Sequence, residues 1–456
     1  MKIDLYDPTE KPGRIVLRLS TPAVLEQSLF MVVGVVSTIL VGRIGNTAIS
    51  AVGLINSVIA LIMAMFIILS TGSTVIVARL IGEGDSAKAK QAVILTTIAG
   101  FVSSFVITVF IYIFSADIIQ IFFAGAEPLV KQYSDIYLRI TLYTLPLFLV
   151  NVIISGCLRG AGDTKTPMWI SYIVNVVNIL LGVVLIYGLN LGFLKIDPMG
   201  VTGAAIAVCI ARGIGGLLAI LAVFRSKSVI TLFKLGRIIP DLLLLKRIVK
   251  IGIPASLEQF FMQGGFLILQ MLVTLMGTTS LAIYQIVLNA NSIISVPIWG
   301  YGTAAITLVG QTLGNRRSDL SEKYGMICIK IGLMVTFILS VIVFIFAKQI
   351  ISVYTTDLSI INSGAAAVRF LCVMQPFLSV VIVLSNAMRG AGDVVFVMVS
   401  TFVCLWLVRI LSVYIFGIVL KMGVSGVWIA MSMDWVSSFV VYFIRFRHGR
   451  WKQIAV

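Results

Sequence analysis

Charged residues are scarce in this sequence. Asp, Glu, Lys and Arg together make up 11% of the 456 residues, whereas hydrophobic residues make up 59%. Soluble domains carry about 25% charged residues. So few charged residues cannot cover the surface of a water-soluble fold of this length. The composition therefore excludes a water-soluble protein. Much of the chain must be solvated by lipid.

Residues that bind metals or serve in catalysis are also nearly absent. The single histidine, His448, lies in the basic C-terminal tail, which excludes a metal site built on histidines. The five cysteines all fall in apolar stretches and form no C-x-x-C motif, so we expect small core side chains rather than disulfides. No G-x-x-x-x-G-K-[ST] loop occurs, so the chain does not hydrolyse ATP itself. We expect no cofactor and no enzymatic activity.

Apolar runs long enough to cross a bilayer recur along the whole chain. A spanning helix needs about 20 mostly apolar residues, whereas a β-barrel would show short segments that are polar at every second position. We therefore predict an all-α integral membrane protein with twelve transmembrane helices. The expected helices cover residues 15–41, 47–78, 91–114, 130–157, 166–188, 200–224, 247–274, 279–311, 324–346, 361–387, 394–419 and 424–444.

The positions of Lys and Arg predict the orientation. With the N-terminus inside, 25 of them fall in inner segments and seven in outer segments, which is the positive-inside signature. The basic segment 225–250 then acts as a topology determinant, with anionic lipid binding as the alternative. The first 14 residues are polar, and the apolar stretch after them is too long for a signal peptide. We expect a multi-pass protein of the plasma membrane with both termini in the cytoplasm and, despite a net charge of +16, no nucleic-acid partner.

The two halves of the chain resemble each other. Pro22, Glu26 and Gln27 recur 232 positions later as Pro254, Glu258 and Gln259, the sequence RGAGD at 159–163 recurs at 389–393, and GVTG at 200–203 recurs as GVSG at 423–426. Because each half has six expected helices, both halves enter the membrane from the same side. We predict two pseudo-twofold-related six-helix bundles around a central cleft. Residues 1–225 would form the N-terminal lobe, 226–246 a basic cytoplasmic linker and 247–456 the C-terminal lobe.

Four motifs carry a family resemblance: VGRIG at 41–45, LRGAGDTKTPM at 158–168, VGQTLGN at 309–315 and MRGAGD at 388–393. With them, the chain resembles the multidrug and toxic compound extrusion (MATE) transporters over nearly its whole length. The resemblance implies twelve helices in two lobes. It also implies the export of organic cations or other drug-like compounds, driven by an inward flow of protons or sodium ions.

The chain departs from the family's pattern at its usual cation sites. Many relatives carry an aspartate in the first helix, five positions before the Gly of VGR, where this chain has Ser37. In the fifth helix Asn178 is present, but Gly182 replaces the aspartate that follows it in such relatives. The coupling ion therefore cannot be carried over, and H⁺ and Na⁺ both stay open, with Asn178 as one candidate for ion coupling.

The repeated RGAGD segment also has a direct physical reading. Its glycines permit a tight turn between helices with positive φ. Asp163 and Asp393 can cap the helix that follows, and Arg159 and Arg389 can bond the last carbonyls of the preceding helix or an acidic partner. We interpret these four residues as structural hinges.

Carboxylates at membrane depth are costly, by about 2.5–3.5 kcal/mol on insertion scales, so each needs a reason. Glu26 and Glu258 each lie four residues after a proline and near the middle of a helix. A carboxyl group that gains a proton from one side and releases it to the other is the simplest coupling element. Our hypothesis is that one or both glutamates carry the driving ion. The alternative is that they bond backbone amides or Gln27 and Gln259 to lock helices together.

Two further charged positions lie near the middle of adjacent expected helices. Asp434 and Arg409 are placed to form a buried ion pair, for which a structural role and a cation-coupling role are both open. Arg212 has no obvious acidic partner, and it could snorkel, bond helix carbonyls or balance Glu26.

Uncharged polar residues at depth predict a polar substrate cavity. Each one alone also fits a role in helix packing. Aromatic and methionine side chains such as Met262 and Trp299 would add an adaptable surface for flat or cationic compounds. The candidates for the cavity are Gln27, Gln259, Gln263, Gln285, Asn289, Gln375 and Asn386.

Together these features predict a cation-coupled (H⁺ or Na⁺) antiporter that exports small amphiphilic or cationic compounds and functions as a monomer. The alternative is a flippase for a lipid-linked sugar, which would need several cations in its cleft to hold a pyrophosphate. A channel is disfavoured because no filter-like segment occurs.

Overall fold

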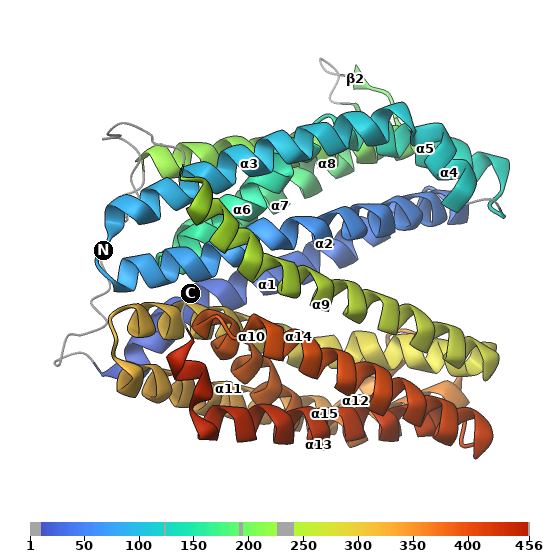
Figure 1. The fold of residues 1–456 in the computed structure, drawn as a ribbon. Helices are drawn as coiled ribbons and strands as arrows, with labels where there is room; N and C mark the ends of the chain where they lie inside the picture. Colours follow the sequence, from blue (N-terminus) through green and yellow to red (C-terminus); the bar gives the residue numbers. More distant parts are fainter. Residues whose placement is uncertain (1–10, 123–124, 191–194, 226–240, 455–456) are drawn as a thin grey trace. The chain divides into compact units, whose positions relative to one another are not determined.

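The computed structural model describes residues 11–122, 125–190, 195–225 and 241–454. These residues are almost entirely helical (Figure 1). The described strands are β1 (Leu189–Asn190) and β2 (Lys195–Ile196), which pair antiparallel between two helices. The predicted all-α class is therefore confirmed. Residues 226–240 of the expected linker, and both chain ends, lie outside the described residues.

The described part of the chain forms two compact units. The first unit contains residues 26–77 and 85–249, so it holds most of α1 and α2. The other helices in this unit lie in chain order between α2 and the start of α9. The helices are α1 (Pro12–Gly42), α2 (Asn46–Gly82), α3 (Ser86–Ile113), α4 (Ser115–Phe122), α5 (Pro128–Leu142), α6 (Leu145–Gly160), α7 (Lys165–Tyr187) and α8 (Gly200–Arg225).

The second unit contains residues 250–456 together with the start of α1, through Leu25, and the end of α2, from Ala78. The predicted lobes 1–225 and 247–456 therefore do not coincide with these units, because α1, α2 and the helix over 242–275 each contribute residues to both. Apart from these parts of α1 and α2, the second unit contains most of α9 and all of the elements that follow it. These elements are α9 (Leu242–Leu275), α10 (Thr278–Gly314), α11 (Ser318–Ile345), α12 (Ala347–Ser352), α13 (Leu358–Ala391), α14 (Val394–Phe402), η1 (Val403–Ile410), η2 (Val413–Val419), α15 (Val424–His448) and η3 (Arg450–Gln453).

All twelve predicted spans are occupied by helix, but one of them is broken. Ten described helices are long and apolar enough to cross a membrane, or eleven if the pair α5–α6 counts as one span. These two helices meet at 58° where a single helix over 130–157 was expected. Pro146 lies in the first turn of α6, and a proline cannot donate the hydrogen bond that would continue the preceding helix. The 34-residue α9 is not among the ten, since several polar side chains, including Glu258, interrupt its apolar run.

The span over residues 394–419 departs from ordinary α-helix. After α14 the chain continues as the π-helical segments η1 and η2. Two residues of η1, Cys404 and Arg409, are buried. Short π-helical segments within α-helices are frequently found at functional sites.

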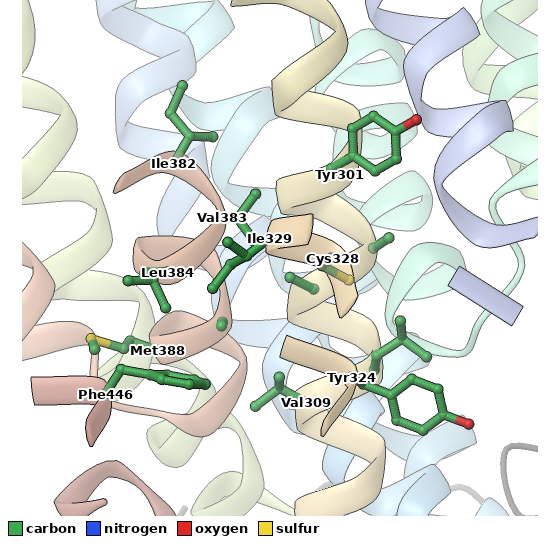
Figure 2. Packing of buried hydrophobic residues seen from close by; sticks show 14 of the residues in the cluster. Tyr301, Val309, Tyr324, Cys328, Ile329, Ile382, Val383, Leu384, Met388 and Phe446 are labelled. Atoms are coloured by element: carbon green, nitrogen blue, oxygen red, sulfur yellow. The ribbon is translucent and has the colours of Figure 1, made fainter. Parts of the chain in front are cut away.

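One hydrophobic core cluster of the second unit forms where α10, α11 and α13 meet (Figure 2). Val309 on α10, Cys328 on α11 and Val383 on α13 are fully buried there. Phe446 near the end of α15 closes the cluster, stacked on Trp451 with ring centroids 5.1 Å apart. All five cysteines are free, as expected from their spacing.

The internal repeat is also visible in how the helices pack within each half. A Cβ on Gly160 would collide with the carbonyl oxygen of Thr74, and a Cβ on Gly390 would collide with that of Ile306. The two contacts are equivalent, since Gly390 lies 230 positions after Gly160 and Ile306 lies 232 positions after Thr74. Gly162 and Gly392 both have φ of 88°, so the predicted tight turn with positive φ is confirmed in both halves.

We predict that Gly160→Ala and Gly390→Ala each destabilise the protein by about 1–3 kcal/mol, the usual cost of overpacking. Thermal unfolding in detergent micelles measures the change. Gly53→Ala is the matched control, because nothing lies within 4 Å of its Cβ position and Ala favours helix by about 1 kcal/mol. An equal stability for all three variants would contradict the packing described here.

Candidate functional site

Glu26 is buried inside the first unit and paired with a cation. It lies one turn after Pro22 in α1 and is 3% exposed. Its Oε1 accepts a hydrogen bond from Arg159 Nη1 at 2.9 Å and another from Ser171 Oγ at 3.4 Å. Arg159 lies at the end of α6 and Ser171 in α7, so the carboxylate joins three helices.

Glu258 has the same surroundings in the second unit. It lies one turn after Pro254 in α9 and is also 3% exposed. Its carboxylate accepts from Arg389 Nη2 at 2.6 Å and from Arg389 Nε at 3.3 Å. Thr401 Oγ1 donates to Glu258 Oε1 at 2.9 Å. Two N–H groups on one edge of the guanidinium group thus face the two oxygens of the carboxylate, which is the bidentate geometry of strong arginine–carboxylate pairs.

The two clusters are copies of one arrangement. Glu26 and Glu258 are 232 positions apart, and the arginines and the hydroxyl residues are each 230 positions apart. The arginines of RGAGD were expected to bond either the last carbonyls of the preceding helix or an acidic partner. The acidic partner is present in both halves. Sequence reasoning singled out these glutamates and arginines separately but did not join them. The nearly equal offsets of the two motifs, 232 and 230 positions, were the signal that could have done so.

The two aspartates of RGAGD differ from each other. Asp163 Oδ1 accepts from the backbone N–H of Thr166 at 3.0 Å, so it caps α7 as predicted. The predicted cap by Asp393 is wrong, since its side chain makes no capping bond to α14. Asp393 Oδ2 instead accepts from Arg445 Nε at 2.8 Å, because α15 brings a guanidinium group within reach.

A cavity of about 260 Å³ lies beside the Glu258 cluster. Glu258, Arg389 and Thr401 form part of its wall. So do the aromatic side chains of Trp299 and Trp435. The cavity therefore combines charged groups with a largely apolar, aromatic surface, as small-molecule sites commonly do.

A second ion pair faces the same cavity. Arg409 Nη2 donates to Asp434 Oδ2 at 2.5 Å, which confirms the pair expected from adjacent helices. Ser438 Oγ donates to Asp434 Oδ1 at 3.3 Å. Arg409 Nε is buried and has no hydrogen-bond partner among the described residues. One cavity thus has two carboxylates, each held by one arginine.

The seven predicted cavity residues lie elsewhere than on this wall. Gln375 and Asn386 are buried just behind it, where Gln375 Nε2 donates to Ser295 Oγ at 2.8 Å and Asn386 Oδ1 accepts from Arg389 Nη1 at 3.0 Å. Both side chains thus position groups that do line the cavity. The remaining five are half-buried or exposed in α1, α9 and α10: Gln27, Gln259, Gln263, Gln285 and Asn289.

The wall contains polar residues that sequence reasoning did not place in the cavity. Ser295, Ser385 and Ser438 belong to it. Of the predicted aromatic and methionine side chains, Met262 and Trp299 also line the cavity. No spacing rule distinguishes these residues from neighbours that face lipid. In the first unit, Asn178 lies half-buried in the middle of α7.

Comparison with known proteins identifies this architecture. A model of the MatE family matches residues 22–184 and 254–415, one match in each half and together most of the chain. The chain belongs to the MatE family. The MATE proteins are multidrug efflux transporters rather than enzymes, and the paired matches confirm the internal repeat.

Relatives of this MATE protein cover nearly its whole length. The probable multidrug resistance protein NorM of Thermotoga maritima is 28% identical over 99% of this chain and 96% of its own. A crystal structure of MATE in complex with MaD3S has a TM-score of 0.86 at 25% identity, covering 97% of this chain and 96% of its own. The outward-facing conformation of a multidrug resistance MATE family transporter has a TM-score of 0.85, also at 25% identity and with the same coverage of both chains.

We predict that Arg389→Met destabilises this protein by about 3–5 kcal/mol, because it leaves the buried carboxylate of Glu258 without its partner. The double variant Arg389→Met/Glu258→Leu should recover part of this loss, since no charge is then left unpaired. Thermal unfolding in micelles measures both.

The matched control is the exposed pair of Arg317 and Asp319, joined at 2.9 Å. Arg317→Met should change stability by less than about 1 kcal/mol. Equal losses for the buried and the exposed pair would contradict the assigned role of Glu258 and Arg389.

Proposed function

We propose that this MATE protein is a cation-coupled antiporter that exports small amphiphilic or cationic compounds. The coupling ion is H⁺ or Na⁺, and the exchange proceeds by alternating access between the two repeated halves. The observation that carries the proposal is the cavity in the second unit, where Glu258 and Asp434 both line the wall.

Each of these carboxylates is neutralised by an arginine, and this suggests how an ion could be coupled. A proton or a sodium ion that binds Glu258 competes with Arg389 for the same oxygens. When the ion binds, the guanidinium group is released, and the link between α9 and α13 weakens. Occupancy by the ion is thereby tied to how tightly two helices are joined, which is what a coupled transporter requires.

A positively charged compound competes for the same carboxylates. Its positive charge replaces that of the ion at the carboxylate. The aromatic rings of Trp299 and Trp435 in the cavity wall can stabilise it by cation–π interactions. Exchange of one bound cation for the other yields antiport. A charge that crosses 100 mV is worth about 2.3 kcal/mol, so a single ion per cycle supplies a useful driving force.

The names of the relatives support export of drugs, since NorM of Thermotoga maritima is described as a probable multidrug resistance protein. Glu26, with the same arrangement in the first unit, is a second candidate for the coupling ion, and Asn178 a third. The plasma membrane, with both termini in the cytoplasm, remains the proposed location, and the monomer remains the proposed functional form.

The flippase alternative receives less support. A lipid-linked pyrophosphate needs several cations that are free to hold it. Arg159, Arg389 and Arg409 each bind a carboxylate, so they offer no such cradle.

We predict that Glu258→Gln lowers gradient-driven export of ethidium at least tenfold, because the variant can no longer exchange an ion at this carboxylate. Glu26→Gln should lower it less, and the double variant should abolish it. The measurement is ethidium efflux from proteoliposomes, first with only a proton gradient and then with only a sodium gradient.

Glu322→Gln is the matched control. Glu322 also pairs with a cation, Lys452, at 2.6 Å, but its side chain is 38% exposed and lies away from the cavity. Its variant should export ethidium at the native rate. Unchanged coupling in the Glu26→Gln/Glu258→Gln protein would refute the role proposed for the two glutamates.

A further inference from the structure

A second cavity, of about 460 Å³, lies where α3 passes the bend between α5 and α6. Phe101, Phe105 and Tyr112 of α3 form one side of it, and Tyr143 and Pro146 at the bend form the other. All of these side chains except Pro146 are exposed, so the cavity is an open groove. Both sides of the groove belong to membrane spans. Exposed apolar surface on such spans is solvated by lipid.

The groove has the length of one lipid chain. Phe101 and Tyr112 are 11 positions apart on α3, which corresponds to about 16 Å at 1.5 Å per residue. Half of a hydrocarbon core about 30 Å thick is about 15 Å, the depth that the acyl chains of one leaflet fill. The 28 residues of α3 extend over about 42 Å, so Tyr112, its last residue but one, lies near the headgroups. The groove thus leads from the headgroups to about the middle of the bilayer.

The end of the groove at Tyr112 has one charged group of each sign beside it. Arg139 lies one turn before Tyr143, and its guanidinium carbon is 5.7 Å from the ring centroid of Tyr112. Its Nε donates to both carboxylate oxygens of Asp135 at 2.8 Å. A guanidinium group has five N–H donors, so this pair leaves donors for a second anion. The side chains of Arg139 and Asp135 are 41% and 35% exposed, so a ligand can reach both charges.

The corresponding place in the second unit lacks the acidic group. Arg369 lies 230 positions after Arg139, and its guanidinium carbon is also 5.7 Å from an aromatic ring, that of Phe344. Its Nε donates to the carbonyl oxygen of Phe344 at 3.2 Å. The residue 230 positions after Asp135 is Ala365, and α13 is one continuous helix where the first unit has its bend. The pair of opposite charges beside a bent span is therefore a property of the first unit.

We propose that this groove binds one zwitterionic phospholipid, with an acyl chain along α3 and the headgroup on Arg139 and Asp135. The phosphate accepts charge-assisted hydrogen bonds from the guanidinium group, and a primary ammonium donates to the carboxylate. An anionic headgroup also satisfies the arginine, but the aspartate repels its second charge or leaves it unpaired. The acyl chain fills the groove and so supports the bend between α5 and α6. This assignment does not depend on the proposed antiport.

Titration of lipid into the delipidated full-length protein, followed by native mass spectrometry, tests the site. The probes are dioleoyl phosphatidylethanolamine, the anionic dioleoyl phosphatidylglycerol, and dioleoylglycerol, which has no phosphate. The native protein should bind its first phosphatidylethanolamine about tenfold or more tightly than either of the other two lipids, the difference expected from charge-assisted hydrogen bonds.

A substitution that fills the groove tests the place of the acyl chain. Val109 also lines the groove, and Val109→Trp should weaken binding of the first phosphatidylethanolamine about tenfold or more, because less of the chain can be buried. Val341→Trp is the matched control, since Val341 lies 232 positions later on α11 and both valines are 42% exposed. The control should bind this lipid within about twofold of the native protein.

Two further substitutions test the headgroup. Arg139→Gln should weaken binding of phosphatidylethanolamine about tenfold, because the phosphate loses its cation. Asp135→Asn should remove the preference for phosphatidylethanolamine over phosphatidylglycerol, because only the cation then remains. Arg369→Gln is the control for the arginine and should leave the binding of all three lipids unchanged.

The lipid preference of the native protein decides the matter even if a tryptophan variant fails to fold. Equal affinity for the three lipids overturns the proposal, because the headgroup then plays no part. Equal losses in Val109→Trp and Val341→Trp also overturn it, since they mean general association with the apolar surface. A native preference for phosphatidylethanolamine without gradient-driven export of ethidium contradicts the proposed antiport and supports the lipid site.

Discussion

The buried pairing of glutamate with arginine is the interaction on which each unit depends. A carboxylate and a guanidinium group that are both removed from water are tolerated only because each neutralises the other. Glu26 and Arg159 join α1 to α6, and Glu258 and Arg389 join α9 to α13. The helix with the proline is thereby fastened to the helix that ends in the RGAGD turn, once in each half. Any agent that separates the two charges also loosens the contact between those helices.

The positions of the helices could be predicted from the sequence because apolar runs of sufficient length have few alternatives in a bilayer. The duplication followed from matched motifs in the same way. The bend between α5 and α6 was missed, since the two helices taken together are long and apolar enough to be read as one span. The pair Arg409–Asp434 was expected from adjacent helices, whereas Arg159 and Glu26 are 133 residues apart and needed the fold to bring them together. Which polar side chains face the cavity depended on rotations of single helices that periodicity does not determine.

The two halves are alike in their framework and different in their charge. Both have the glutamate, the arginine and the hydroxyl residue, so the duplication preserved the fastening between helices. The second unit adds Asp434 with its own arginine, whereas the first has Arg212 without a described carboxylate partner. A duplicated scaffold has therefore acquired two chemically distinct interiors, and the distinction is invisible in the motifs that reveal the duplication.

The π-helical segment η1 has a mechanical consequence. A π-helical hydrogen bond spans five residues where an α-helical one spans four, so successive side chains turn about the helix axis by a smaller angle than the about 100° of an α-helix. Arg409 lies within η1, so the direction in which its side chain leaves the helix is set by this wider turn. The bond from Arg409 to Asp434, and with it the charge on this part of the cavity wall, is therefore tied to the π-helical form of the segment.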